Sequence, residues 1–387
     1  MHTLPESHLT YCTNIHSGET WAKVCESLQY VLQVRDNLQQ TGPFGIGLRL
    51  SAQAARELAR TPVLRSFQEW LSENDCYVFT LNGFPYGDFH GQVVKDRVHT
   101  PDWTTSDRLV YTKQLFDILA ELLPEGMTGG VSTSPLSYAP WHRSAAALRR
   151  TKEVSTHYLM ELVDYLAAIH QRTGKLLHLD IEPEPDGVLG DGPGFIAYYQ
   201  DYLLGQGKSE TLVRRHLRMC YDVCHFAVNY ESPTEVLTQL SARGIAVGKL
   251  QISAALKADL RTTDRQSVRA ALQPYDEPTY LHQVNLRDGG NRIHSFPDLA
   301  PALAAVDNEQ YQELRTHFHV PIYTDSYGLL QSTNDAIVET LRLWRADPFT
   351  HHLEVETYTW DVLPDHQRLT LTDSIHRELA WVLKNLR

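Results

Sequence analysis

Three apolar segments of this chain end in side chains that bind divalent metal ions. They are LLHLDIEPEP (176–185), RMCYDVCH (218–225) and HHLEVETYTW (351–360). A carboxylate follows each apolar stretch, namely Glu182, Asp222 and Glu356, and His225 comes three residues after Asp222. Carboxylate oxygens combined with an imidazole suit Mn²⁺, Zn²⁺, Mg²⁺ or Co²⁺. Because the C-terminal ends of parallel barrel strands converge on one pocket, this pattern predicts a site for one divalent metal at the rim of such a barrel.

The alternation of residues within these segments places polar side chains on one face. Residues two apart on a strand share a face, so His178, Asp180 and Glu182 point the same way, as do Glu354 and Glu356. A buried carboxylate without a partner is costly, and that partner is either a divalent ion or a buried Lys or Arg. We expect Glu182 and Glu356, which lie nearest the rim, to be ligands, and a purely structural role is the alternative.

The fourth protein ligand has two candidates. Gln251, in the segment IAVGKLQIS (245–253), would stand beside Asp222 if the two segments are neighbouring strands. An amide oxygen is an acceptable but weak ligand. His319, in the segment HFHVP, competes for the same position. Glu184 follows the apolar part of the segment 176–185 and lies between two prolines. We expect it to be a solvated loop residue.

Several polar and aromatic residues near strand ends are candidates for substrate contacts. His16 ends the strand-like segment 9–16. Asn82 and Tyr86 lie in the glycine-punctuated loop NGFPYGDFHG at the end of the strand-like segment 76–83. Tyr358 and Trp360 follow the last strand and would form a stacking wall for a sugar-like ring. Aromatic residues that only close the top of the barrel are the alternative.

The elements that must position these residues alternate between strands and helices. The strand candidates are 9–16, 44–51, 76–83, 128–135, 176–182, 218–224, 245–253 and 351–358. Periodic apolar stretches such as 21–34 and 108–123 suit amphipathic helices between them. Ser51 and Ser232 stand at the starts of predicted helices as capping residues. The pattern predicts an α/β fold, a single (β/α)8 TIM barrel.

The interval before the last strand is much longer than the others. Residues 254–350 contain two further strand-like pieces, 279–286 and 317–324. We expect 279–286 to belong to an extended loop over the barrel mouth, and 317–324 is either part of that loop or a barrel strand. Nothing resembling a linker interrupts residues 1–387, so we expect one domain with a long insertion.

The composition favours a cytoplasmic enzyme that acts on small molecules. A formal net charge of −12 argues against nucleic acid or an anionic membrane as partner. The sequence contains no apolar run long enough to cross a bilayer. The five cysteines lack a paired C-x-x-C pattern, and we expect free thiols in a reducing cytoplasm, although Cys220 and Cys224 flank Asp222 and would suit a softer metal. The oligomeric state stays open.

The order of these features resembles the xylose-isomerase-like TIM-barrel superfamily, which includes sugar isomerases and sugar 3-epimerases. The resemblance implies that a Glu, an Asp, a His and a second Glu from strands five to eight hold one divalent metal. By position these are Glu182, Asp222, the seventh-strand ligand and Glu356, and His225 matches a substrate-binding histidine. The chain departs from the pattern at strand seven, where Gln251 replaces the histidine.

Three longer motifs resemble the EboE-type metabolite-traffic proteins. They are LTYCTNIHSGETW, HLDIEPEPDG and LEVETYTWDVLP, which lie near the start, in the middle and near the end of the chain. The resemblance implies a role beside prenyltransferase-like and cyclitol-synthase-like proteins in the processing or movement of metabolites. It names a pathway and no reaction.

Two functions fit these observations. The first is a divalent-metal-dependent isomerase or epimerase acting on a sugar or cyclitol-like metabolite, in which Glu182 and Glu356 exchange protons with the substrate and His225 orients it. The second is a non-catalytic metabolite-binding or traffic protein that retains the barrel pocket, which Gln251 in place of histidine favours. An endonuclease-IV-type hydrolase fits less well, because its DNA-binding rim would be basic.

Overall fold

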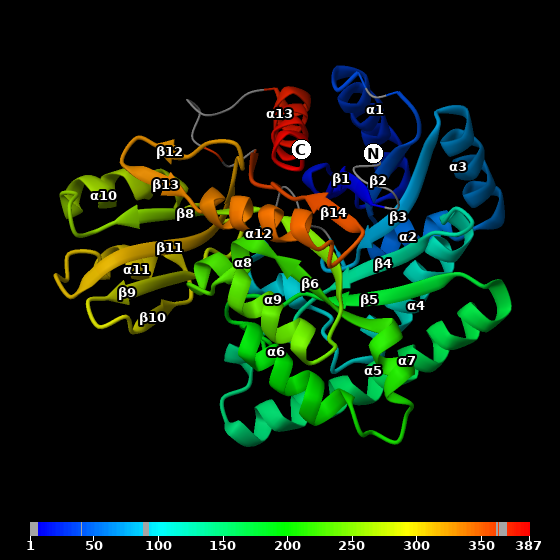
Figure 1. Ribbon diagram of the computed structural model, residues 1–387, viewed down its shortest axis with the longest axis horizontal. Helices are drawn as coiled ribbons and strands as arrows, with labels where there is room; N and C mark the ends of the chain where they lie inside the picture. The colour runs from blue at the N-terminus through cyan, green and yellow to red at the C-terminus, as the bar shows by residue number, and fades with distance from the viewer. Residues whose placement is uncertain (1–6, 40, 88–92, 361–362, 364–369) are drawn as a thin grey trace.

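The barrel predicted from the sequence is present. The computed structural model describes residues 7–39, 41–87, 93–360, 363 and 370–387. Eight parallel strands form a nearly closed barrel in the order β1-β14-β7-β6-β5-β4-β3-β2 (Figure 1). They are β1 (His8–Tyr11), β2 (Phe44–Arg49), β3 (Cys76–Asn82), β4 (Thr128–Thr133), β5 (Leu176–Ile181), β6 (Leu217–Asp222), β7 (Val247–Ile252) and β14 (His352–Val355). Each overlaps one of the segments expected to be strands, so the predicted TIM-barrel fold is confirmed.

Helices connect these strands and cover the outside of the barrel. They are α1 (Trp21–Asn37), α2 (Ala52–Leu58), α3 (Thr61–Glu73), α4 (Ser106–Leu122), α5 (Ala145–Thr173), α6 (Gly192–Tyr198), α7 (Glu210–His216), α8 (Val223–Val228), α9 (Pro233–Ala242), α12 (Asn334–Ala346) and α13 (Leu371–Asn385). The two predicted caps are present: Ser51 Oγ accepts from the backbone N of Ala54, and Ser232 Oγ accepts from that of Glu235. No described helix has both the length and the apolar composition that a membrane crossing requires.

A threonine side chain helps to close the barrel between β1 and β2. An isolated parallel bridge joins Cys12, the residue after β1, to Gly47 of β2. Thr10 Oγ1 donates to the Gly45 carbonyl at 2.8 Å and accepts from the Gly47 N–H at 3.1 Å. Gly47 is required here, because a Cβ at this position would lie 1.9 Å from Glu354 Oε1.

The barrel interior contains two buried polar pairs that account for part of the predicted polar face. His178 Nδ1 lies 2.6 Å from Asp180 Oδ1, and Lys249 Nζ lies 2.6 Å from Glu354 Oε2. Gly248 makes room for the first pair, because a Cβ there would lie 1.7 Å from Asp180 Oδ1. Asp180 and Glu354 thus have protein partners inside the barrel, and only that of Glu354 is the buried lysine or arginine that the sequence argument named.

The long interval before β14 forms a second sheet, so the expectation of an extended loop is wrong. The sheet has six antiparallel strands in the order β10-β9-β11-β8-β13-β12. They are β8 (Ala254–Asp259), β9 (Val284–Asp288), β10 (Ile293–Phe296), β11 (Tyr311–Val320), β12 (Ser326–Tyr327) and β13 (Leu330–Ser332), with helices α10 (Arg265–Leu272) and α11 (Leu299–Ala305). This second sheet lies beside the barrel, at the left in Figure 1.

The segments whose role was uncertain are therefore strands outside the barrel. The piece 279–286 runs into β9, and the piece 317–324 overlaps the end of β11, which pairs with both β8 and β9. The pairing of β11 with β8 is irregular between Thr316 and Val320. Such irregularities re-aim side chains next to functional sites, and this one lies where β11 reaches the barrel mouth.

Helix α13 fastens the end of the chain to this region through one buried carboxyl group. Glu378 Oε1 accepts from Thr357 Oγ1 at 2.7 Å and from the Ile322 backbone N at 3.2 Å. One acceptor therefore joins the loop after β14 to the chain that leaves β11. Burial raises the pKa of Glu378 to about 8.

Candidate functional site

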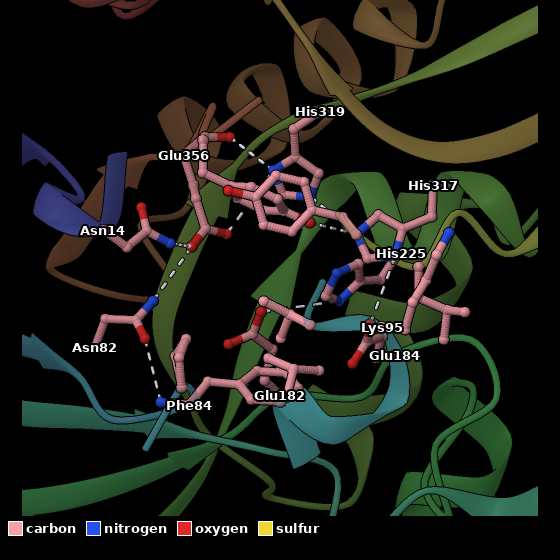
Figure 2. A pocket seen from close by; sticks show the side chains of 16 residues that line it. Asn14, Asn82, Phe84, Lys95, Glu182, Glu184, His225, His317, His319 and Glu356 are labelled. Atoms are coloured by element: carbon pink, nitrogen blue, oxygen red, sulfur yellow. Dashed lines mark hydrogen bonds and ion pairs between the residues drawn. The ribbon is translucent and has the colours of Figure 1, made fainter. Parts of the chain in front are cut away.

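A pocket opens at the C-terminal ends of the barrel strands. Its volume is about 530 Å³ when its open mouth is included. One part of its lining is apolar, with Phe84, Pro85, Tyr280, Leu281 and Tyr358. The other part is polar and gathers carboxylates, imidazoles and amides, as Figure 2 shows. This location is where catalytic groups of TIM-barrel enzymes lie.

Three of the predicted metal ligands converge at the barrel mouth, and two of them, Glu182 and Glu356, line this pocket. An oxygen of each of Glu182, Asp222 and Glu356 lies within 4.8 Å of the other two. Glu182 follows β5, Asp222 ends β6, and Glu356 follows β14. All three residues are buried. Each carboxylate lies at or just past the C-terminal end of its strand, where the barrel strands converge.

Amide groups hold one of these carboxylates, and a hydroxyl holds another. Asn14 Nδ2 donates to Glu356 Oε1 at 2.6 Å, and Asn82 Nδ2 donates to the same oxygen at 3.2 Å. Ser253 Oγ donates to Asp222 Oδ1 at 2.6 Å. Among the described residues, Glu182 Oε2 and Asp222 Oδ2 have no hydrogen-bond partner. These two oxygens are therefore free to bind a cation.

The electrostatics of the three carboxylates require a positive charge or a proton. Burial raises the pKa of Glu182 well above its usual value, and the charges of Glu356 and Asp222 raise it further. Burial and then Asp222 raise the pKa of Glu356 to about 8. The barrel pair Lys249–Glu354 shows the contrasting case, in which a lysine neutralises the carboxylate. A divalent cation would supply the missing charge here.

Imidazoles form the side of the pocket next to the carboxylates. His225 lies in α8, three residues after Asp222, and His317 and His319 lie on β11 of the second sheet. Nitrogens of His225 and His319 and an oxygen of Asp222 lie within 4.8 Å of one another. Burial lowers the pKa of His317 well below its usual value and that of His319 to about 4. Both rings are therefore neutral at neutral pH.

Glu184 is buried in the pocket, so the expectation of a solvated loop residue is wrong. Its Oε1 accepts from Gln283 Nε2 at 3.3 Å and lies 3.5 Å from His317 Nδ1. Its Oε2 lies 3.7 Å from Nε2 of the fully buried His99. Burial raises the pKa of Glu184 to about 8. The flanking prolines keep the chain out of a helix, but the second sheet covers it.

The two candidates for the fourth ligand lie in different places. Gln251 is buried on β7, in register with Asp222 of β6 and Glu354 of β14. Its side-chain amide approaches Glu356 and lowers the pKa of that carboxyl group, against the larger effects of burial and Asp222. His319 reaches the pocket from the second sheet, with its Nδ1 3.9 Å from Glu356 Oε2.

The structure brings only some of the predicted substrate contacts to the pocket. Asn82, His225 and Tyr358 line it. His16 does not line it; its ring stacks on Tyr30 and bonds to Tyr11 on another face of the barrel. Tyr86 lines a neighbouring hollow, and Trp360 is buried in the hydrophobic core.

Sequence reasoning missed other residues that line the pocket. His317 was within reach of the strand argument, because it is two residues before His319 and shares its face. Lys95, Tyr280 and Leu281 carried no such signal. Lys95 begins a short 3-10 helix, and Tyr280 and Leu281 precede β9 of the second sheet, so no barrel-strand pattern places them.

The fold is a TIM barrel like that of solved xylose-isomerase-like proteins. The chain is similar over all of its length, at 11% identity, to 98% of a xylose-isomerase-like TIM-barrel protein from Mycobacterium smegmatis solved with magnesium, with a TM-score of 0.53. It is also similar over 98% of both chains to a D-tagatose 3-epimerase-like protein (12% identity, TM-score 0.49) and to the IolI protein solved with a zinc atom (13% identity, TM-score 0.47). No family model and no curated protein sequence matches the chain.

Proposed function

We propose that this protein is a divalent-metal-dependent isomerase or epimerase that acts on a sugar or cyclitol-like metabolite. The observation that carries the proposal is the convergence of Glu182, Asp222 and Glu356 at the barrel mouth, where no lysine or arginine of the described residues forms an ion pair with them. Glu354, by contrast, pairs with Lys249 in the barrel interior. Oxygen ligands of this kind suit Mg²⁺ or Mn²⁺. Gln251 lies beside Asp222 and offers one further oxygen.

The residues around the carboxylates suit a polyol. A bound divalent cation would polarise vicinal substrate oxygens and stabilise an enediolate. Glu182 and Glu356 would take up and return the proton at the reacting carbon, and their raised pKa values suit acids and bases that work near neutral pH. His225 donates through Nδ1 to the Pro183 carbonyl at 2.9 Å, which leaves Nε2 to accept from a substrate hydroxyl.

The test is solvent-deuterium exchange into a panel of ketohexoses, ketopentoses and keto-inositols, together with Mn²⁺ titration. We expect Glu182→Gln and Glu356→Gln to abolish the exchange and to weaken Mn²⁺ binding. Glu231→Gln is the matched control, because burial also raises the pKa of Glu231 to about 8 but this residue does not line the pocket. Exchange retained in both pocket variants would rule out the mechanism.

A non-catalytic metabolite-binding protein of the EboE type is the second candidate. The residue that favours it is Gln251, a weak ligand at the position where sugar epimerases of this fold have a histidine. Its role would lie in a pathway for the processing or movement of metabolites in the cytoplasm. Ligand binding without deuterium exchange, across the whole panel, would favour this candidate over the enzyme.

A further inference from the structure

Six of the apolar side chains that line the pocket lie outside the contiguous hydrophobic core. They form an apolar wall that consists of Phe84, Val94, Val98, Tyr280, Leu281 and Tyr358. Among the described residues, the core cluster includes none of them, and none is one of the partly buried residues that pack against it. Val98, Leu281 and Tyr358 are only half-buried. The apolar surface of this wall is thus directed at the pocket and is not part of the core.

Backbone hydrogen bonds hold the apolar wall in place. The Thr279 carbonyl accepts from the backbone N of Val94 at 2.8 Å and from that of Lys95 at 3.1 Å, which joins the segment after β3 to the segment before β9. Buried Arg108 donates through Nη1 to the Phe84 carbonyl at 3.0 Å. The wall therefore has a fixed position, and a ligand need not order it on binding.

The apolar wall adjoins the carboxylates of the pocket. Phe84 is two residues after Asn82, and its backbone N donates to Asn82 Oδ1 at 3.1 Å (Figure 2). Asn82 in turn donates to Glu356 Oε1, and Tyr358 is two residues after Glu356. A molecule whose polar end binds at the carboxylates therefore has the apolar wall beside it.

The pocket is poorly suited to a phosphate group. Of the described residues that line it, only Lys95 is a lysine or arginine, and its Nζ lies 2.6 Å from Asp298 Oδ2 and 3.2 Å from the Glu277 carbonyl. The charge of Lys95 is therefore neutralised by Asp298. Many TIM barrels bind phosphate with the loop after the seventh strand and the N-terminus of a short helix. Here β7 ends at Ile252, and strand β8 begins at Ala254.

An unsubstituted sugar or cyclitol matches only the polar part of this pocket. Such a molecule carries a hydroxyl group on nearly every carbon, and a hydroxyl placed against apolar side chains loses its hydrogen bonds to water without gaining others. An aryl or alkyl group would instead remove apolar surface from water. Tyr280 and Tyr358 already form an edge-to-face pair, with centroids 5.1 Å apart and an interplanar angle of 70°, and a further ring could extend this pair.

We infer that the substrate is an uncharged polyol or keto-polyol with one apolar substituent, an aryl or alkyl group, and that the apolar wall binds this substituent. The inference rests on the proposed function, which supplies the polar end of the molecule at the carboxylates. It adds the chemistry of the other end and excludes a phosphate there.

The test compares the binding of matched ligands to the full chain loaded with Mn²⁺. For each ketohexose, ketopentose and keto-inositol of the panel, calorimetry gives the Kd of the parent, of its O-benzyl and O-butyl ethers, and of its phosphate ester. We expect at least one ether to bind about tenfold or more tightly than its parent, because one methylene in an apolar pocket is worth about tenfold or more. A larger gain for benzyl than for butyl identifies an aryl substituent, and the reverse identifies an alkyl one. If no ether binds more tightly than its parent, or if a phosphate ester is the tightest ligand, the inference is overturned.

Substitutions in the apolar wall should reduce this gain. Leu281→Ala should lower the ratio of ether affinity to parent affinity about tenfold. Val98→Ala should lower it as well and replaces the first variant if that one does not fold. Leu237→Ala and Val63→Ala are the matched controls, because Leu237 and Val63 are also half-buried but pack against the core and do not line the pocket. The same ratio in the wild type and in both wall variants would refute the role of the wall.

The binding ratio and the deuterium exchange fail independently, which separates this inference from the proposed function. If an unsubstituted ketose exchanges deuterium and no ether binds more tightly, the apolar substituent is refuted and the proposed function stands. If ethers bind more tightly but no compound of the panel exchanges deuterium, the proposed reaction is refuted and the assignment of the apolar wall stands.

Discussion

Removal of the lysine from the buried Lys249–Glu354 pair should strongly destabilise the barrel. Both side chains are fully buried, and the Nζ–Oε2 distance is 2.6 Å. Burial alone would lower the pKa of Lys249, but the adjacent Glu354 carboxylate outweighs it and the pKa is raised. The ammonium is therefore charged in the folded protein. Lys249→Met retains most of the side-chain volume and leaves the Glu354 carboxylate without a counter-charge.

The expected loss is large compared with the stability of a typical protein. Breaking a buried ion pair on one side costs about 3–5 kcal/mol, against a total free energy of unfolding of about 5–15 kcal/mol. The variant should lose less stability at pH 5 than at pH 8, because the lone carboxyl group can take up a proton at acidic pH. The difference in stability between wild type and variant should therefore grow as the pH rises.

Urea unfolding followed by circular dichroism measures this loss. The double variant Lys249→Met/Glu354→Gln has no buried charge and should regain most of the stability. Lys113→Met is the matched surface control, since Lys113 lies 2.6 Å from Glu161 but both are partly exposed, and this change should cost less than about 1 kcal/mol. A loss in Lys249→Met no larger than that in Lys113→Met, or a double variant as unstable as the single one, would refute the reasoning.

Three further substitutions probe other features of the fold. Glu378→Gln should raise the melting temperature at pH 9 and change it little at pH 5. The pKa of Glu378 is about 8 in the folded state, above its value in the unfolded state, so the wild type loses stability as the pH rises through 8. Glutamine cannot ionise and avoids this loss. Gly248→Ala should lower the free energy of unfolding by at least about 1–3 kcal/mol, because its Cβ would overlap Asp180. Thr10→Val should cost about 1–3 kcal/mol, because it leaves the polar groups of the β1–β2 junction unpaired.

Each of these substitutions has a control and a contradicting result. Equal melting temperatures of wild type and Glu378→Gln at pH 9 would contradict the raised pKa. Gly290→Ala, in an exposed turn where a Cβ meets only Asp288 Oδ1 at 3.4 Å, is the control for Gly248→Ala and should change stability little. Thr10→Ser retains the hydroxyl, so it should be more stable than Thr10→Val; the reverse order would contradict the role of this hydroxyl.

The sequence predicts the barrel well because its signals are local. Each barrel strand is a short apolar run, and the polar residue at its end is fixed by the strand itself. The parallel order then brings the strand ends together, which is why the amino-acid pattern is enough to place Glu182, Asp222 and Glu356 near one point. The caps Ser51 and Ser232 are equally local.

The remaining features depend on contacts between distant parts of the chain. The strand Val284–Asp288 pairs with β10 and β11, and no short-range pattern indicates those partners. The burial of Glu184 follows from the docking of the second sheet, which the prolines beside it do not reveal. The prediction that His16 contacts the substrate is wrong because of local geometry. His16 follows a barrel strand, but the chain turns after Tyr11 and directs the imidazole to Tyr30.

The two sides of the pocket come from separate parts of the chain. The carboxylates are complete once the barrel strands pair, whereas the imidazoles of β11 arrive only when the second sheet docks on the mouth. A competent pocket therefore needs both the closed barrel and the docked second sheet. In evolution, exchange of the segment between β7 and β14 would give the same scaffold a new set of side chains over the pocket without altering a single barrel strand.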